Sequence, residues 1–86
     1  MEIRFTRAAR RHRISRESVR YVMATCEPRG LTTNYGKPGW LYRGRDDTGR
    51  ELEVIAVDVT ERGREYVLVI HVMPAKGTRG KKGGRR

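Results

Sequence analysis

The sequence predicts a small α+β protein with a short N-terminal strand, two helices, a three-stranded antiparallel meander and a disordered basic C-terminal tail. An apolar stripe at helical spacing in the first third of the chain indicates a helix that packs on a sheet. Two later segments rich in β-branched residues indicate paired strands. Because 86 residues have room for only one core, we expect a single domain over residues 1–76 and a flexible tail over 77–86.

The first half of the chain supplies the first strand and both helices. Residues 2–5 alternate polar and apolar side chains, which predicts a short edge strand. Thr6 is placed to cap a surface helix over 7–13, which is rich in Arg and Ala and has a thin apolar face. Ser15 is placed to cap a second helix over 16–26. The stripe of this second helix consists of Val19, Val22, Met23 and Cys26.

The second half of the chain predicts the meander. Residues 29–39 contain three glycines and a proline without a sustained period, so we interpret them as a loop. Strands are expected from Trp40, over 51–59 and over 66–73, joined by turns at 46–49 and 61–64. The last of these strands carries apolar residues on both faces, which predicts a central position in the sheet. The segment after it is too polar to offset its ordering entropy and is predicted to be disordered.

Positive charge dominates the composition. The chain has 20 Lys and Arg against 10 Asp and Glu, a net charge of +10. Self-repulsion of this size favours a polyanionic partner, and nucleic acid is the expected one. The N-terminus lacks the order of a signal peptide, and no run of about 18 apolar residues occurs, so we expect a cytoplasmic protein that does not enter membranes.

Several chemistries have no signature in the sequence. Cys26 is the sole cysteine, so neither an intrachain disulfide nor a cysteine-based zinc site is available, and we interpret Cys26 as a core residue. A phosphate-binding P-loop, a nucleophile elbow and a dinucleotide fingerprint are also missing. We therefore expect no metal and no cofactor.

Five short motifs follow one another along the chain. They are IRFTRAAR at 3–10, ISRESV at 14–19, YRGR at 42–45 before GRELEV at 49–54, and VIHVMP at 69–74. In their order and spacing, which span residues 3–76, the sequence resembles the small domains grouped with the RelE/BrnT superfamily of toxins.

The resemblance implies a compact αβ ribonuclease that is the toxin of a toxin–antitoxin pair and cuts messenger RNA without a metal. In such enzymes the ribose 2′-hydroxyl attacks the adjacent phosphate, and basic side chains stabilise the transition state. Related domains commonly carry a His in the first helix where this chain has Ala8, so a catalytic role is not carried over to that position. We hypothesise that His12, one helical turn further along, takes its place.

Attack by an internal hydroxyl needs a general base, a general acid and cations around the phosphate. The sequence has two histidines, His12 and His71. Under strict alternation, His71 shares a strand face with Val67, Val69 and Met73. His71 belongs to a site if that face is open, and to the core or its margin if that face packs on the helix. His12 lies among arginines, and a solvated surface histidine is the competing interpretation.

Three arginines flank one predicted hairpin turn. Arg43, Arg45 and Arg50 can converge on a phosphate, whose oxygens match the guanidinium fork. Alternatively, they pair with nearby acids, which are Asp46, Asp47 and Glu51. Glu51 and Glu53 share a strand face, and either is a candidate base or an ordinary exposed carboxylate.

Further binding candidates lie outside this hairpin. Tyr42 and Tyr35 are expected to stack on unpaired bases, although aromatic residues near strand starts also serve as core. A set of basic residues is expected to contact the phosphate backbone, unless they reflect a generally arginine-rich surface. This set comprises Arg7, Arg10, Arg11, Arg13, His12 and Lys76.

Two functions remain open on the sequence alone. The first is a metal-independent endoribonuclease toxin, restrained by a cognate antitoxin, in which His71, Arg43, Arg45 and Arg50 carry the chemistry on RNA. The second is a non-catalytic RNA- or DNA-binding module in which the same cations only neutralise phosphates.

Overall fold

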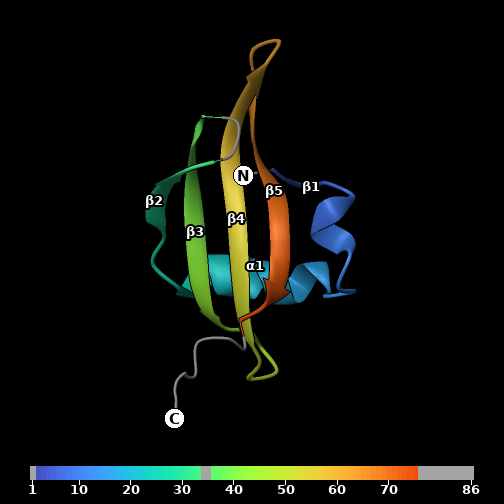
Figure 1. The fold of residues 1–86 in the computed structure, drawn as a ribbon. Coiled ribbons are helices and arrows are strands. Elements are labelled where there is room, and N and C mark those ends of the chain that lie inside the picture. The colour runs from blue at the N-terminus through green and yellow to red at the C-terminus, as the bar shows by residue number, and fades with distance from the viewer. Residues whose placement is uncertain (1, 34–35, 76–86) are drawn as a thin grey trace.

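The strand-forming segments of the chain all enter one sheet. In the computed structural model, which describes residues 2–33 and 36–75, the sheet has the order β1-β5-β4-β3-β2. Strand β1 pairs with β5 in parallel, and the other three pairs are antiparallel (Figure 1). The strands are β1 (Ile3–Phe5), β2 (Arg29–Thr32), β3 (Pro38–Arg45), β4 (Glu51–Glu61) and β5 (Arg64–Pro74).

The expectation of a three-stranded antiparallel meander is wrong, because two further strands extend the sheet. Residues 29–39, interpreted as a loop, contain β2 and the start of β3, which hydrogen-bond to each other. Strand β1 joins the opposite edge beside β5, where Ile3 lies opposite Val67 and Phe5 opposite Val69. The result is a mixed five-stranded sheet in which β5 lies between two other strands, as predicted.

The expectation of two helices is also wrong, because the arginine-rich segment forms only a single 3-10 turn, η1 (Ala8–Arg10). Thr6 Oγ1 does accept a hydrogen bond from the backbone N of Ala9, at 3.1 Å. Only Ala9 of this turn is buried, and so short a segment has too little packing to offset the unfavourable nucleation of a helix. Arg13 then adopts a left-handed φ of 57°, which turns the chain away from helical geometry.

The second predicted helix is confirmed as α1 (Arg16–Thr25). Ser15 caps it, because its Oγ accepts a hydrogen bond from the backbone N of Ser18 at 3.0 Å. Glu17 lies in the first turn, where its charge is favoured by the helix dipole. No helix of the described chain combines the length and the apolar character that crossing a membrane requires.

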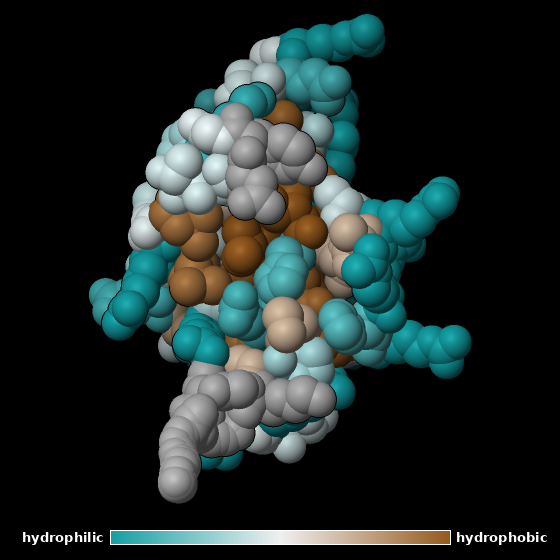
Figure 2. Space-filling view, in the orientation of Figure 1, coloured by the Kyte–Doolittle hydropathy of each residue, from teal (hydrophilic) through white to brown (hydrophobic). Residues whose placement is uncertain are grey.

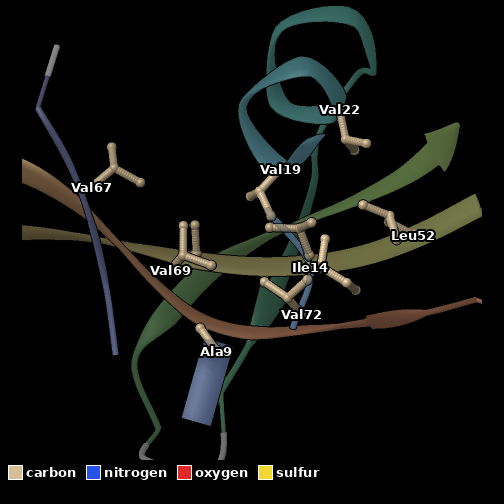
Figure 3. Packing of buried hydrophobic residues seen from close by; sticks show 10 residues of the cluster. Ala9, Ile14, Val19, Val22, Leu52, Val67, Val69 and Val72 are labelled. Carbon is tan, nitrogen blue, oxygen red and sulfur yellow. The ribbon is translucent and has the colours of Figure 1, made fainter. Parts of the chain in front are cut away.

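The hydrophobic core lies between α1 and one face of the sheet. Val19 and Val22 from the helix are buried against side chains of β4 and β5 (Figure 3). Gly44 of β3 lets the helix end approach, because a Cβ at that position would overlap the sulfur of Cys26. The buried cluster consists of Ala9, Ile14, Val19, Val22, Leu52, Val54, Ala56, Val67, Val69 and Val72. We call this side of the sheet the covered face, and the side turned away from α1 the open face (Figure 1).

Asp46 holds the turn between β3 and β4. Its Oδ1 accepts hydrogen bonds from Thr48 N at 2.9 Å, from Thr48 Oγ1 at 2.7 Å and from Arg50 N at 2.9 Å. Burial by itself would raise the pKa of Asp46, but the hydrogen bonds from Thr48 and Arg50 outweigh it and lower the pKa to about 2. Ser18 of α1 donates to Asp47 at 2.9 Å and so ties this turn to the helix.

Candidate functional site

An extra residue in β5 changes the strand's register halfway along. Ile55 of β4 lies opposite His71, but the next residue, Ala56, lies opposite Val69. Ile70 therefore has no partner of its own, as in a β-bulge.

The register of β5 beyond the bulge decides the face on which His71 lies. Val69 and Val72 are both buried on the covered face, although they are three residues apart. His71, next to Val72, is turned to the open face. The strict alternation that placed His71 with Val67 and Val69 is wrong, because the extra residue shifts the alternation by one position.

On the open face, His71 belongs to a cluster with Glu53 and Arg43. The Nε2 atom of His71 is 3.5 Å from Glu53 Oε2, and the Nη2 atom of Arg43 is 3.9 Å from Glu53 Oε1. Cross-strand pairing sets this arrangement, since Arg43 lies opposite Glu53, and His71 lies opposite Ile55, two residues further along β4 on the same face. The carboxylate is 27% exposed and the histidine side chain 37%, so the cluster is partly shielded but open to a ligand.

The two ring nitrogens of His71 differ in their surroundings. Nε2 is shielded from solvent and makes no hydrogen bond to any residue that the structure describes. Its nearest charged group is the Glu53 carboxylate, at a distance typical of an ion pair but without hydrogen-bond geometry. Nδ1 is therefore the nitrogen that remains for chemistry on a bound ligand.

A polar hollow lies beside this cluster at the β2 edge. It has a volume of about 430 Å³ and is lined by Glu27, Pro28, Arg29, Leu41 and Arg43. Arg29 lies opposite Leu41 in the β2–β3 pair, so it shares the open face with Arg43. Two guanidinium groups at one hollow can bind a phosphate. We call this the arginine hollow.

The other end of the open face is apolar. A second hollow, of about 570 Å³, is lined there by side chains of β4 and β5 and by residues near the β2–β3 connection. Its apolar floor consists of Val57, Val59, Leu68 and Ile70, and the rest of its lining is Thr33, Lys37, Pro38, Trp40, Asp58 and Thr60. Figure 2 shows hydrophobic atoms gathered over the middle of the sheet, with hydrophilic atoms below them. We call this the apolar hollow.

The three arginines of the predicted phosphate clamp have three different partners. Arg43 faces Glu53, Arg45 donates to the backbone oxygen of Gly49 at 3.4 Å, and Arg50 lies 3.5 Å from Asp46 Oδ2. The structure therefore brings only Arg43 to His71. The alternative in which the hairpin's own acids pair with these arginines describes Arg50 correctly.

Of the two aromatic candidates, the structure describes only Tyr42, and it does not lie beside His71. Tyr42 is on the covered face, where it packs against the buried cluster. Burial, with a contribution from the charge of Asp58, raises the pKa of Tyr42. Trp40 is 39% exposed and donates from Nε1 to Asp58 Oδ2 at 3.0 Å. Tyr35, together with Lys76 and the predicted tail 77–86, lies outside the described residues.

The basic residues before α1 form a separate surface. Arg7, Arg10, Arg11, His12 and Arg13 are all exposed. They lie in and after η1, which contacts β5 next to the β1 edge, whereas the arginine hollow is at the β2 edge. The structure thus divides the cations between two edges of the sheet, with the segment around η1 at the β1 edge and the arginine hollow at the β2 edge (Figure 1).

Sequence reasoning missed Arg29, because the glycines and proline after it favoured a loop. The signal that could have found it is the pair Thr32-Thr33, which is β-branched and precedes a glycine-containing turn, as in a hairpin. In the part of the chain that the structure describes, no three His, Cys, Asp or Glu side chains group as metal ligands would. No protein-family model matches this sequence, and neither the curated proteins nor the solved structures contain a match to it.

Proposed function

We propose that the protein is a metal-independent endoribonuclease that cleaves RNA on the open face of its sheet. The observation that carries this proposal is the pairing of His71 with Ile55 beyond the bulge at Ile70, which turns His71 to that face beside Glu53 and Arg43. An imidazole, a carboxylate and a guanidinium at these distances are the groups that transesterification by a 2′-hydroxyl uses. The net charge of +10 gives RNA a favourable field in which to approach.

In the proposed reaction, Nδ1 of His71 accepts the proton of the 2′-hydroxyl as O2′ bonds to phosphorus. The P–O5′ bond breaks, O5′ takes a proton from water, and the hydroxide left behind takes the proton back from the imidazolium. The products are a 2′,3′-cyclic phosphate and a free 5′-hydroxyl, with His71 neutral again. Glu53 stabilises the imidazolium that forms, because its charge lies next to Nε2. Arg43 and Arg29 stabilise the negative charge that develops on the phosphate oxygens.

Cleavage of a labelled single-stranded RNA in the presence of EDTA tests this proposal. We expect His71→Gln to lower kcat/KM at least about 100-fold, because a positioned general base contributes that much or more. His12→Gln is the matched control, since it removes the other histidine, which is exposed and outside the cluster of His71, Glu53 and Arg43, and it should cleave like the wild type. RNA with 2′-O-methyl groups should stay intact, because the attacking hydroxyl is blocked. A fully active His71→Gln variant would refute the proposed role of this residue.

The second candidate function is a nucleic-acid-binding module without catalysis. It is favoured by the two exposed cationic surfaces at opposite edges of the sheet, which can neutralise phosphates without any acid–base group. RNA that is retarded on a gel but remains uncut would support this function. In that case Arg29→Gln should reduce the slope of log affinity against log salt by about 1, the value for one lost phosphate contact.

The family resemblance adds a proposed biological role, that of a toxin with a cognate antitoxin. Induced expression should then arrest growth, and co-expression of the protein encoded by an adjacent gene should relieve the arrest. The His71→Gln variant, expressed at the same level, should not arrest growth. Arrest that persists in this variant would show that toxicity does not depend on the proposed chemistry.

A further inference from the structure

The apolar hollow takes no part in the proposed reaction, although it begins next to His71. Ile70, the bulged residue, lines the hollow and directly precedes His71 in β5. We propose that this hollow binds one unpaired base of the RNA, that of a nucleotide adjacent to the cleaved phosphate. The inference rests on the proposed function and narrows its substrate to single-stranded RNA with a base that can leave its stack.

The spacing along β4 places the hollow within reach of such a base. Glu53, Ile55, Val57 and Val59 alternate onto the open face, and each step of two residues covers about 7 Å. The floor at Val57 is thus one step from the Ile55–His71 pair and two steps from Glu53. A nucleotide whose phosphate lies at the cluster can therefore lay its base or its neighbour's base on the floor.

The absence of a side chain on β3 helps to shape the hollow. Gly39 is buried, and a Cβ on it would lie 3.0 Å from Thr33 Cγ2 and 3.3 Å from Val57 Cγ1. Thr33 and Val57 can therefore approach each other across β3 at Gly39, while its neighbours Pro38 and Trp40 line the hollow. The flat aliphatic surface that results suits the face of a planar ring.

Charge complementarity identifies the occupant. Arg29 and Arg43 lie on one side of the apolar floor, and Lys37 lines the hollow on the other side, where the acid Asp58 is held by a hydrogen bond from Trp40. A nucleotide within an RNA chain has its groups in a matching order, with a phosphate on each side of the base. An apolar peptide would cover the floor equally well, but it would bring no phosphate to these cations.

A base in a duplex cannot reach the hollow. In double-stranded RNA the bases are paired and stacked, and proteins contact mainly the backbone and the shallow groove. Single-stranded bases, in contrast, can be splayed out and stacked on protein side chains. The hollow therefore predicts cleavage in unpaired regions.

Abasic substrates test this inference with the full chain. An oligodeoxynucleotide with a single ribonucleotide confines cleavage to one phosphate, and an abasic sugar is placed directly 5′ or 3′ of that phosphate. We expect one abasic position to lower kcat/KM about tenfold, as the loss of one stacked base does, and the other position to have little effect. The wild-type protein is measured with both substrates and with the intact one.

Two variants locate the effect in the hollow. Val57→Trp fills it, so the intact substrate should lose about the same factor of ten, and the abasic sugar should cause no further loss. Tyr21→Trp, which adds an indole at an exposed position of α1, is the control and should keep the full abasic effect. Leu68→Gln removes part of the apolar floor with little change in volume and replaces Val57→Trp if that variant does not fold.

The outcomes separate this inference from the proposed function. Equal kcat/KM for intact and abasic substrates, with cleavage that still depends on His71, would overturn the base site and leave the ribonuclease proposal standing. An abasic effect that persists in Val57→Trp would also overturn the base site. No cleavage by the wild type would overturn the ribonuclease proposal, and equal affinities of intact and abasic strands by fluorescence anisotropy would then overturn the base site as well.

Discussion

The covered and open faces of the sheet are made by the same strands but differ in what lies on them. On the covered face, Leu52 and Val54 of β4 are fully buried under α1. On the open face, Ile55 and Val57 of the same strand are only partly buried, and no helix of the described chain lies over them (Figure 1). An apolar surface that stays uncovered commonly marks a binding site. The difference teaches that the fold is stabilised from one side, which leaves the other side free for a ligand.

The largest expected effect comes from deleting an apolar side chain on the covered face. Leu52→Ala should lower the free energy of unfolding by about 3 kcal/mol, because the helix prevents the cavity from collapsing. Leu68→Ala, on the open face, should cost about 1 kcal/mol, because its side chain is partly solvated already. Urea denaturation of both variants measures the difference. Equal losses would mean that the open face is as tightly packed as the covered one.

The contact between α1 and β3 gives the next largest effect. Gly44→Ala places a Cβ into the sulfur of Cys26 and should cost about 2 kcal/mol, as overpacking does. The double variant Gly44→Ala/Cys26→Ala should recover most of this loss, because the sulfur is gone and only an ordinary contact with the Cβ of residue 26 remains. Thermal unfolding monitored by circular dichroism measures both.

Gly30→Ala is the matched control for Gly44→Ala. Gly30 is also in a strand, but a Cβ there meets nothing within 4 Å. We expect its free energy of unfolding to change by less than about 0.5 kcal/mol. A Gly44→Ala variant as stable as Gly30→Ala would contradict the close approach of α1 to β3.

The helix and strands of the covered face could be predicted from the sequence, but the two edge strands of the sheet could not. The stripe of α1 and the runs that became β4 and β5 are strongly periodic, so their patterns indicate both the element and the buried side. Strands β1 and β2 are short and gain their stability from pairing with β5 and β3, which local patterns do not encode. The prediction of a helix in the arginine-rich segment was wrong for the opposite reason. Its residues favour a helix locally, but they have almost nothing to pack against.

The candidate site could be predicted in part only. Sequence reasoning selected His71, Arg43 and Glu53, because their side chains suit phosphate chemistry. It could not place them together, because the face on which His71 lies depends on a bulge that forms through pairing with β4. Arg29 was missed because its strand was, and Tyr42 was assigned to binding although it packs on the core.

The β3–β4 turn is expected to be sensitive to acid. It also supports the covered face, because Ser18 of α1 donates a hydrogen bond to Asp47 in this turn. The pKa of Asp46 is lowered to about 2 in the folded protein from 3.8, so its ionised form stabilises the fold above pH 4. This contribution is lost as the pH falls from about 4 to about 2. Asp46→Asn should therefore cost about 1–2 kcal/mol at pH 7, less than the full pKa difference implies because solvent near the surface screens the charge.

Chemical denaturation across this pH range measures the effect of Asp46→Asn. The difference in the free energy of unfolding between wild type and variant should narrow from pH 4 downward, because the wild type loses a stabilisation that the variant lacks at every pH. A gap that is as large at pH 2 as at pH 7 would mean that the hydrogen bonds of the turn do not depend on the charge of Asp46.

The smallest effect on stability is expected at the bulge, which lies between Val69 on the covered face and His71 on the open face. Deletion of Ile70 should leave Val69 on the covered face and His71 on the open face, because the strand on either side then continues in one register. The free energy of unfolding should change by about 1 kcal/mol or less, since Ile70 has no partner in β4. Deletion of Leu68 is the control, because it turns Tyr66 and Val67 to the opposite faces and should unfold much of the sheet.

Nuclear magnetic resonance measures the outcome of the Ile70 deletion through contacts between the His71 ring and the open-face residue Ile55. If these contacts survive, the open position of His71 is a property of its register against β4, and the bulge only accommodates an inserted residue. If the ring instead contacts Val19 or Val22, the bulge itself holds His71 out of the core. The second result would contradict the register argument and would make Ile70 the residue that keeps the two faces of β5 distinct.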